Sequence, residues 1–259
     1  MTLARLWHIA FNTFREAVRD RVLYNLVFFA LLMVGSAPLF GQISIGLERI
    51  VLVNLGLTAI TLFGVVIAIF IGIGLVSKEI DKRTLYTVLS RPVRRWEFIC
   101  GKYLGLAGTL IVNAFFMSLG LFAAVLYVKR GLSGEDGHIL VALYLIVLQF
   151  LVITAITLLF SSFSSPLLSA LFAFGVFVIG NFVDDLRGFA LLAQGFQRWL
   201  ILGLSYLVPN FGSMNVVSQV AHGQPVAAAL IGMNTLYACL YVFASLSGAV
   251  LIFERRNLK

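Results

Sequence analysis

Residues 53–76, VNLGLTAITLFGVVIAIFIGIGLV, contain no charged side chain. A helix of about 20 apolar residues is long enough to cross the hydrocarbon core of a bilayer. The next residues, 77–102, read SKEIDKRTLYTVLSRPVRRWEFICGK and are rich in Lys, Arg, Asp and Glu. We therefore expect a membrane span that is followed by a charged loop, which lies in water on one face of the membrane.

The composition of the whole chain extends this interpretation. Of its 259 residues, 61% are hydrophobic and 12% are charged, whereas about a quarter of the residues of a soluble domain are charged. The mean hydropathy is +1.02. We expect an all-α polytopic membrane protein with a single domain, residues 1–259. Six segments are apolar and long enough to span a membrane: 22–40, 53–76, 98–128, 139–161, 165–183 and 226–253.

Residues 184–225, between the last two segments, have a mixed character. They contain an apolar run, 189–208, that polar residues interrupt and that a Pro-Asn pair follows. These polar residues and the pair are Gln194, Gln197, Arg198, Pro209 and Asn210. We expect an external region with one or two short helices, either re-entrant or interfacial. A seventh span is the alternative.

The distribution of Lys and Arg predicts the orientation. Short loops on the cytoplasmic side of a membrane carry an excess of these residues. Six spans with both termini inside place 14 of the 19 Lys and Arg residues on the inner side and 5 on the outer side. We therefore expect cytoplasmic termini and a cytoplasmic loop at residues 77–97. A seventh span would move Arg255 and Arg256 outside, against this distribution.

The first residues, 1–21, have the pattern of an amphipathic helix. Apolar residues recur at helical spacing and polar residues take the opposite face. The apolar residues are Leu3, Leu6, Trp7, Ala10, Phe11, Phe14, Ala17 and Val18. This pattern is typical of a helix that lies in the membrane interface. The alternative is an amphipathic helix that packs on protein.

The sequence contains no nucleotide-binding loop. Gly101 and Lys102 resemble the end of a phosphate loop, but that loop needs a Gly five residues before its second Gly and a Ser or Thr after its Lys. Trp96 and Tyr103 occupy those positions. We expect no enzyme activity, cofactor or metal site on this chain, and no nucleic-acid partner.

The interiors of the spans lack charged residues. Charged residues inside a membrane mark ion or substrate pathways, so their absence argues against a proton-coupled secondary transporter and against intramembrane catalysis. Several spans do contain amides and hydroxyls. The amides among them either line a translocation surface or bond neighbouring helices: Asn54, Asn113, Gln149, Asn181 and Asn234. The residues that we assign to a candidate translocation surface are Asn54, Thr58, Thr61 and Asn181.

The charged loop itself has a helical pattern from residue 78 to 89. Ile80, Leu85 and Val88 form an apolar stripe, while charged residues face water. Pro92 ends the helix, because a proline disfavours helical geometry in the residue before it. The result is a short helix parallel to the membrane, which a cytoplasmic partner can bind. The alternative is a basic loop that lies on anionic lipid.

The order of residues in this loop resembles that of type-2 ABC transporter permeases. Many of these permeases carry an acidic residue, a Thr, a Leu-Ser-x-Pro turn, a basic residue, a Glu and a Gly-Lys pair at the start of the third span. The matching residues are Glu79, Thr84, Leu89, Ser90, Pro92, Arg95, Glu97, Gly101 and Lys102. The segment from Tyr206 to Phe211 is similar to a Pro-Asn segment of the nitrous-oxide-accessory export permeases. The chain departs from many relatives at Arg83, where they have Gly.

The resemblance implies a function for the chain and a site for its partner. It implies the membrane subunit of an ATP-driven exporter in the cell inner (cytoplasmic) membrane, paired with a second copy or a similar permease. It also implies two separate cytoplasmic ATPase subunits, which hold the ATP and Mg. The coupling residues would be Lys78, Glu79, Asp81, Lys82, Arg83, Thr84, Ser90, Pro92, Arg94, Arg95 and Glu97. A membrane scaffold or regulatory subunit that transports nothing is the alternative.

Overall fold

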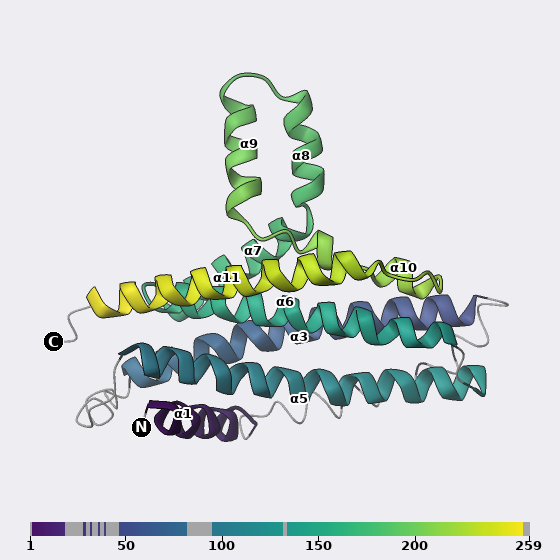
Figure 1. Ribbon diagram of the computed structural model, residues 1–259, viewed down its shortest axis with the longest axis horizontal. Helices are drawn as coiled ribbons and strands as arrows, with labels where there is room; N and C mark the ends of the chain where they lie inside the picture. The colour runs from purple at the N-terminus through teal and green to yellow at the C-terminus, as the bar shows by residue number, and fades with distance from the viewer. Residues whose placement is uncertain are drawn as a thin grey trace.

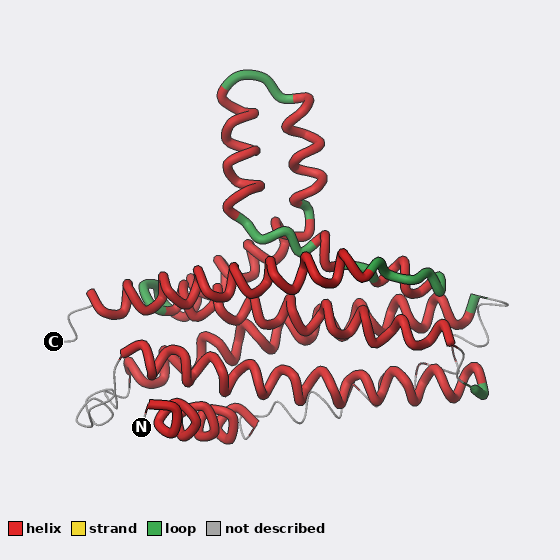
Figure 2. Tube along the Cα trace, in the orientation of Figure 1, coloured by secondary structure: helices red, strands yellow, loops and turns green. Residues whose placement is uncertain are grey.

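The computed structural model describes residues 2–18, 28, 29, 32, 36, 39, 47–81, 95–131 and 134–255, with only the backbone at 2–4, 74–81, 254 and 255. Within these ranges the chain forms helices joined by short loops, and no strand is present (Figure 2). The fold class expected from the sequence is therefore confirmed as all-helical. The first expected segment, 22–40, lies outside the described residues except for Phe28, Phe29, Leu32, Ser36 and Leu39, which are helical.

Four long helices lie side by side along the molecule (Figure 1). They are α3 (Glu48–Asp81), α5 (Arg95–Lys129), α6 (Gly137–Ser161) and α11 (Ala228–Arg255). Each contains a stretch that is long and apolar enough to cross a membrane. They correspond to the second, third, fourth and sixth segments that the sequence predicts.

Helix α6 forms the centre of the core, because it packs against α3, α5, α7 and α11. Its side chains Leu145, Phe150 and Ile153 are at most 1% exposed. A Cβ atom on Gly64 of α3 would overlap the ring of Phe150. Small residues let helices approach closely where lipid supplies no hydrophobic driving force, and Gly64 gives α3 this close contact.

Helix α1 (Thr2–Ala17) packs along the first third of α5. A Cβ atom on Gly105 would lie 2.6 Å from the Cβ of Thr13, so this glycine permits the contact. Ala10 and Thr13 are buried there, whereas Trp7 and Phe11 are 69% and 55% exposed. One face of the amphipathic helix is therefore covered by protein, and its position in the membrane interface stays a prediction.

The fifth expected segment, 165–183, corresponds to a helix that is short for a membrane span. Helix α7 (Pro166–Asn181) has 16 residues, about 24 Å of helix, which is less than the roughly 30 Å of a hydrocarbon core. It bends by 65° into α8 (Val183–Leu192), and α9 (Phe196–Leu207) returns toward the bundle. The chain then continues through η3 (Gly212–Met214) and α10 (Val217–Ala221). Figure 1 shows α8 and α9 standing away from the bundle and α10 lying near one of its ends.

The other short element, η2 (Gly134–Asp136), lies before α6. The side chain of Asp136 accepts from Arg49 Nε at 3.0 Å and from Lys129 Nζ at 3.2 Å. Arg49 Nη1 also donates to the carbonyl of Ala221 at 3.0 Å. These contacts join α3, α5, α6 and α10 at one end of the bundle. Arg49 and Lys129 are two of the five basic residues that the sequence predicts on the outer side, but the sequence did not predict that Asp136 lies between them.

Candidate functional site

The expected coupling residues are distributed over the end of α3, the start of α5 and the segment between them. Lys78, Glu79 and Asp81 lie in the last turns of α3, whose backbone is helical to Asp81 without a break. The sequence instead predicted that the span ends near residue 76 and that a separate helix starts at 78. Arg95 and Glu97 lie in the first turn of α5. The remaining residues of the set lie outside the described residues: Lys82, Arg83, Thr84, Ser90, Pro92 and Arg94.

Arg95 joins the start of α5 to the end of α11. Its Nη1 donates to the carbonyl oxygen of Phe253 at 2.7 Å, and its guanidinium lies 5.9 Å from the centroid of the Phe253 ring. The last carbonyls of a helix have no partner within the helix and carry partial negative charge. A cation from another helix therefore stabilises this end of α11. The sequence gave Arg95 a role toward a partner but did not predict this contact.

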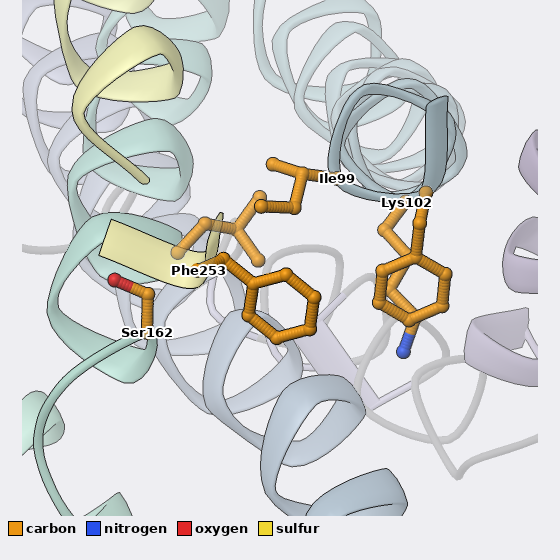
Figure 3. A pocket seen from close by; sticks show the side chains of 6 residues that line it. Ile99, Lys102, Ser162 and Phe253 are labelled. Atoms are coloured by element: carbon orange, nitrogen blue, oxygen red, sulfur yellow. The ribbon is translucent and has the colours of Figure 1, made fainter. Parts of the chain in front are cut away.

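An aromatic contact reinforces the same junction. The rings of Phe98 and Phe253 stack with centroids 6.1 Å apart, and Lys102 Nζ lies 4.8 Å from the centroid of Phe98. Lys102 is 3% exposed and Glu97 is fully buried. A small, mostly apolar pocket remains between these helices, and Figure 3 shows Lys102 and Ser162 on its opposite sides. The pocket is lined by Phe98, Ile99, Lys102, Leu158, Ser162 and Phe253.

We call this group of Arg95, Phe98, Lys102 and Phe253 the inner junction. It is a packed joint between α5, α6 and α11. The position of the inner junction matters for coupling, because the chain between Asp81 and Arg95 connects the end of α3 to Arg95, a residue of the junction. A force on that connection would therefore act on α3 and α5 together, and through Arg95 on α11.

A second polar group lies where α9 returns to the bundle. The backbone N–H of Asn210 donates to the hydroxyl of Tyr237 at 2.8 Å, and Asn210 Nδ2 donates to Asp184 Oδ1 at 2.8 Å. Asn210 Oδ1 accepts from the backbone N–H of Ser213 at 3.1 Å. Asn234 donates from Nδ2 to the Ser213 carbonyl at 3.0 Å and accepts from Ser213 Oγ at 3.1 Å. This network, the neck, ties α8, the segment 209–213 and α11 together.

The neck is level with the middle of α6. Gln149, which lies midway between Gly137 and Ser161, donates from Nε2 to the carbonyl of Phe211 at 3.3 Å. A Cβ atom on Gly180 of α7 would lie 2.5 Å from the ring of Phe211, so α7 also closes on this segment. The sequence left open whether Gln149 and Asn234 line a pathway or bond neighbours. The structure shows that each donates a hydrogen bond to a neighbouring segment, and a role in a pathway stays a prediction. The Pro-Asn pair was the sequence signal for this site.

The candidate translocation residues fall into two separate places. Thr58 Oγ1 donates to Asn54 Oδ1 at 3.5 Å, and Thr61 Oγ1 donates to the carbonyl of Leu57 at 2.9 Å, so these residues share one face of α3. Asn181 Nδ2 donates to the carbonyl of Phe177 in its own helix, α7. Among the described residues, no hydrogen bond joins Asn181 to the polar face of α3. The assignment of a pathway stays a prediction.

Two buried amides have unpaired polar atoms in the part of the chain that the structure describes. Both side-chain atoms of Asn113, on α5, and Oε1 of Gln149 lack a hydrogen-bond partner. Each residue is 2% exposed. A buried polar group without a partner destabilises the folded state, so these amides are candidates for a role other than packing.

One known protein family matches nearly the whole chain. A family model described as ABC-2 family transporter protein matches residues 7–258. The match includes most of α1, every long helix that the structure describes, the connection between α3 and α5, and the neck. No curated protein matches the chain.

Proposed function

The chain belongs to the ABC-2 family of transporter proteins, and we propose that it is the membrane subunit of an ATP-driven exporter. Membership of the family makes the chain a membrane transport subunit, and its long apolar helices are those of a multi-pass membrane protein. The proposal adds the source of energy, the partners and the direction of transport. It places the subunit in the cell inner membrane with both termini in the cytoplasm, as the excess of Lys and Arg on that side supports.

The ATP and Mg are proposed to bind to two separate cytoplasmic ATPase subunits. The packing of the Gly101-Lys102 pair supports this division. Both residues lie inside α5, where a Cβ atom on Gly101 would lie 2.7 Å from the side chain of Ile9. A phosphate loop needs an open backbone that surrounds the phosphates, and a helix that packs on α1 does not supply it.

The inner junction is the observation that carries the coupling mechanism. Binding of ATP would close the two ATPase subunits, and residues 77–97 would receive that movement. Since Arg95 bonds the end of α11 and follows the connection from α3, a displacement of this loop would move three long helices at once. The bundle would thereby change shape without any chemistry on this chain.

The transport pathway is proposed to lie between two permease subunits, either two copies of this chain or this chain and a similar permease. The polar face of α3 with Asn54, Thr58 and Thr61 and the end of α7 with Asn181 are our candidates for that interface. The Pro-Asn pair at the neck supports a relation to the nitrous-oxide-accessory export permeases.

The experiment is co-purification of the tagged chain in mild detergent, with partners identified by mass spectrometry. We expect an ABC ATPase to co-purify and the chain alone to hydrolyse no ATP. The substitution Glu79→Arg should release the ATPase, because like charges across an interface cost several kcal/mol, while membrane insertion is kept. A reversal on the outer loop, Arg130→Glu, is the matched control and should retain the ATPase.

Two results would contradict the proposal at different levels. Hydrolysis of ATP by the isolated chain would refute the division of labour between subunits. Full retention of the ATPase by the Glu79→Arg variant would show that the charged loop is not the docking element. An ATPase that binds but whose activity responds to no candidate substrate in liposomes would favour a scaffold.

A further inference from the structure

Helices α8 and α9 form a hairpin that exposes many large apolar side chains, which the rest of the described chain leaves uncovered. Figure 1 shows it standing away from the bundle, nearly perpendicular to the long helices. Six of its large apolar side chains are between 61% and 81% exposed: Phe189, Leu191, Leu192, Phe196, Trp199 and Leu207. Apolar patches of this kind mark surfaces that contact protein or membrane.

The depth of the hairpin limits what can cover it. Its neck lies level with Gln149, midway along α6, so the hairpin leaves the bundle near the middle of the proposed membrane. This depth differs from the external position that the sequence predicts for residues 184–225. It contains an irregular tip at Ala193–Gly195 and four charged residues: Asp184, Asp185, Arg187 and Arg198. Irregular backbone and charges occur at this depth only where protein or a water-filled cavity surrounds them. Lipid tails alone are therefore a poor cover.

Two of these four charged residues form no ion pair within the described chain. Asp184 and Arg187 lie 3.5 Å apart and form an ion pair within α8. Asp185, near the base of the hairpin, and Arg198, near its tip, have no ion-pair partner among the described residues. A surface that presents one unpaired acid and one unpaired base at its two ends is complementary to an inverted copy of itself.

We propose that the hairpin packs antiparallel against the hairpin of a second copy of this chain, with Asp185 facing the partner's Arg198 and Arg198 facing the partner's Asp185. The inference rests on the proposed pairing of two permeases. A symmetric pair in a membrane has its two-fold axis parallel to the membrane normal, and hence to the long helices. A half-turn about that axis reverses a hairpin that lies perpendicular to it. The base of one hairpin then meets the tip of the other, and the two ion pairs form together, as in any isologous contact.

Charge reversal tests the ion pairs in the full-length protein. Either Asp185→Arg or Arg198→Asp should weaken the homodimer at least about 100-fold in its dissociation constant in detergent, because each change places like charges at two symmetric sites. The double variant Asp185→Arg, Arg198→Asp exchanges both charges and should restore the dimer. Arg15→Asp on α1 is the matched control and should leave the dimer unchanged.

Disulfide formation tests the antiparallel arrangement without depending on charge. In a background with Cys100→Ala and Cys239→Ala, two differently tagged chains are co-expressed, one with Asp185→Cys and the other with Arg198→Cys. Mild oxidation in membranes should link the two tags. The matched controls, in which both chains carry Asp185→Cys or both carry Arg198→Cys, should stay unlinked, because cysteine Cα atoms more than about 7 Å apart do not bridge.

The outcomes separate this inference from the proposed function. A dimer that forms and binds the ATPase but gives no link between residues 185 and 198 overturns the antiparallel hairpin and leaves the proposed function in place. Links between identical positions would overturn it in favour of a parallel contact. Absence of any homodimer overturns the inference, and if the ATPase still co-purifies, a heterodimer replaces the homodimer in the proposed function.

Discussion

Helix α6 and the α8–α9 hairpin both carry many large apolar side chains, but these side chains have opposite surroundings. In α6, Leu145, Phe150 and Ile153 are at most 1% exposed, while in the hairpin Phe196 and Trp199 are 80% and 75% exposed. The chain covers α6 with its own helices and leaves the hairpin to be covered by something else. An apolar segment therefore indicates that its surface is kept from water. It does not indicate whether the same chain or another molecule covers that surface.

The largest difference is expected from matched phenylalanine substitutions. Phe150→Ala should destabilise the protein by about 3–5 kcal/mol, because it leaves a cavity in the centre of the core. Phe196→Ala should change the free energy of unfolding of the monomer by no more than about 0.5 kcal/mol, since the ring is exposed. Unfolding in detergent, below the concentration at which the chain associates, measures both.

The Phe150→Ala and Phe196→Ala variants could also give a result that contradicts the contrast between α6 and the hairpin. If Phe196→Ala destabilised the monomer as much as Phe150→Ala, the hairpin would have to pack on its own bundle. An effect of Phe196→Ala on dimer dissociation alone would agree with the hairpin as a contact between copies.

An intermediate effect is expected at the neck, where the two regions meet. Asn210→Ala removes the hydrogen bonds to Asp184 and to the Ser213 backbone, and we expect a loss of about 2 kcal/mol. The hairpin should lose its fixed direction, which increased protease cleavage near residue 195 would reveal. Gln197→Ala, an exposed amide change within the hairpin, is the control. Equal protease protection in both variants would show that the neck does not hold the hairpin.

The smallest effect is expected inside the core, at the unpaired amide of Asn113. The substitution Asn113→Leu keeps the branching and the number of heavy atoms and removes two buried polar atoms without partners, so we expect a stabilisation of about 1 kcal/mol. Transport by the reconstituted complex is the second measurement. A stabilised protein with normal transport would show that Asn113 only packs, whereas a loss of transport would place it on the pathway.

Several local features of the sequence predicted the structure well. The apolar segments near residues 53–76, 98–128, 139–161 and 226–253 correspond to α3, α5, α6 and α11, because hydrophobic length is a local property. The amphipathic pattern of α1 was also informative, although the pattern did not show that Gly105 and Thr13 bring α1 onto α5.

The features that the sequence did not predict depend on contacts between distant residues. Arg95 was assigned to a partner, yet it bonds Phe253, which lies 158 residues later in the chain. Asp184, an exposed residue in the first turn of α8, accepts a hydrogen bond from Asn210 in the neck, a contact that the sequence did not predict. Neither periodicity nor spacing in the sequence predicts such pairs, because each residue of a pair, taken alone, is an ordinary charged or polar residue.

The sequence by itself determined that this protein is helical, lies in a membrane and belongs to a transporter family, because a bilayer accepts only long apolar segments and the charged loop has a characteristic order. Only the tertiary structure decided that the fifth span breaks at Phe182, that a hairpin leaves the bundle at the level of Gln149, and that the inner junction joins α5 to α11. The physical reason is that helix formation and membrane insertion depend on local properties of a segment, namely its internal backbone hydrogen bonds and its apolar side chains. Breaks, polar networks and uncovered surfaces depend on which groups the folded chain brings within a few ångströms of one another.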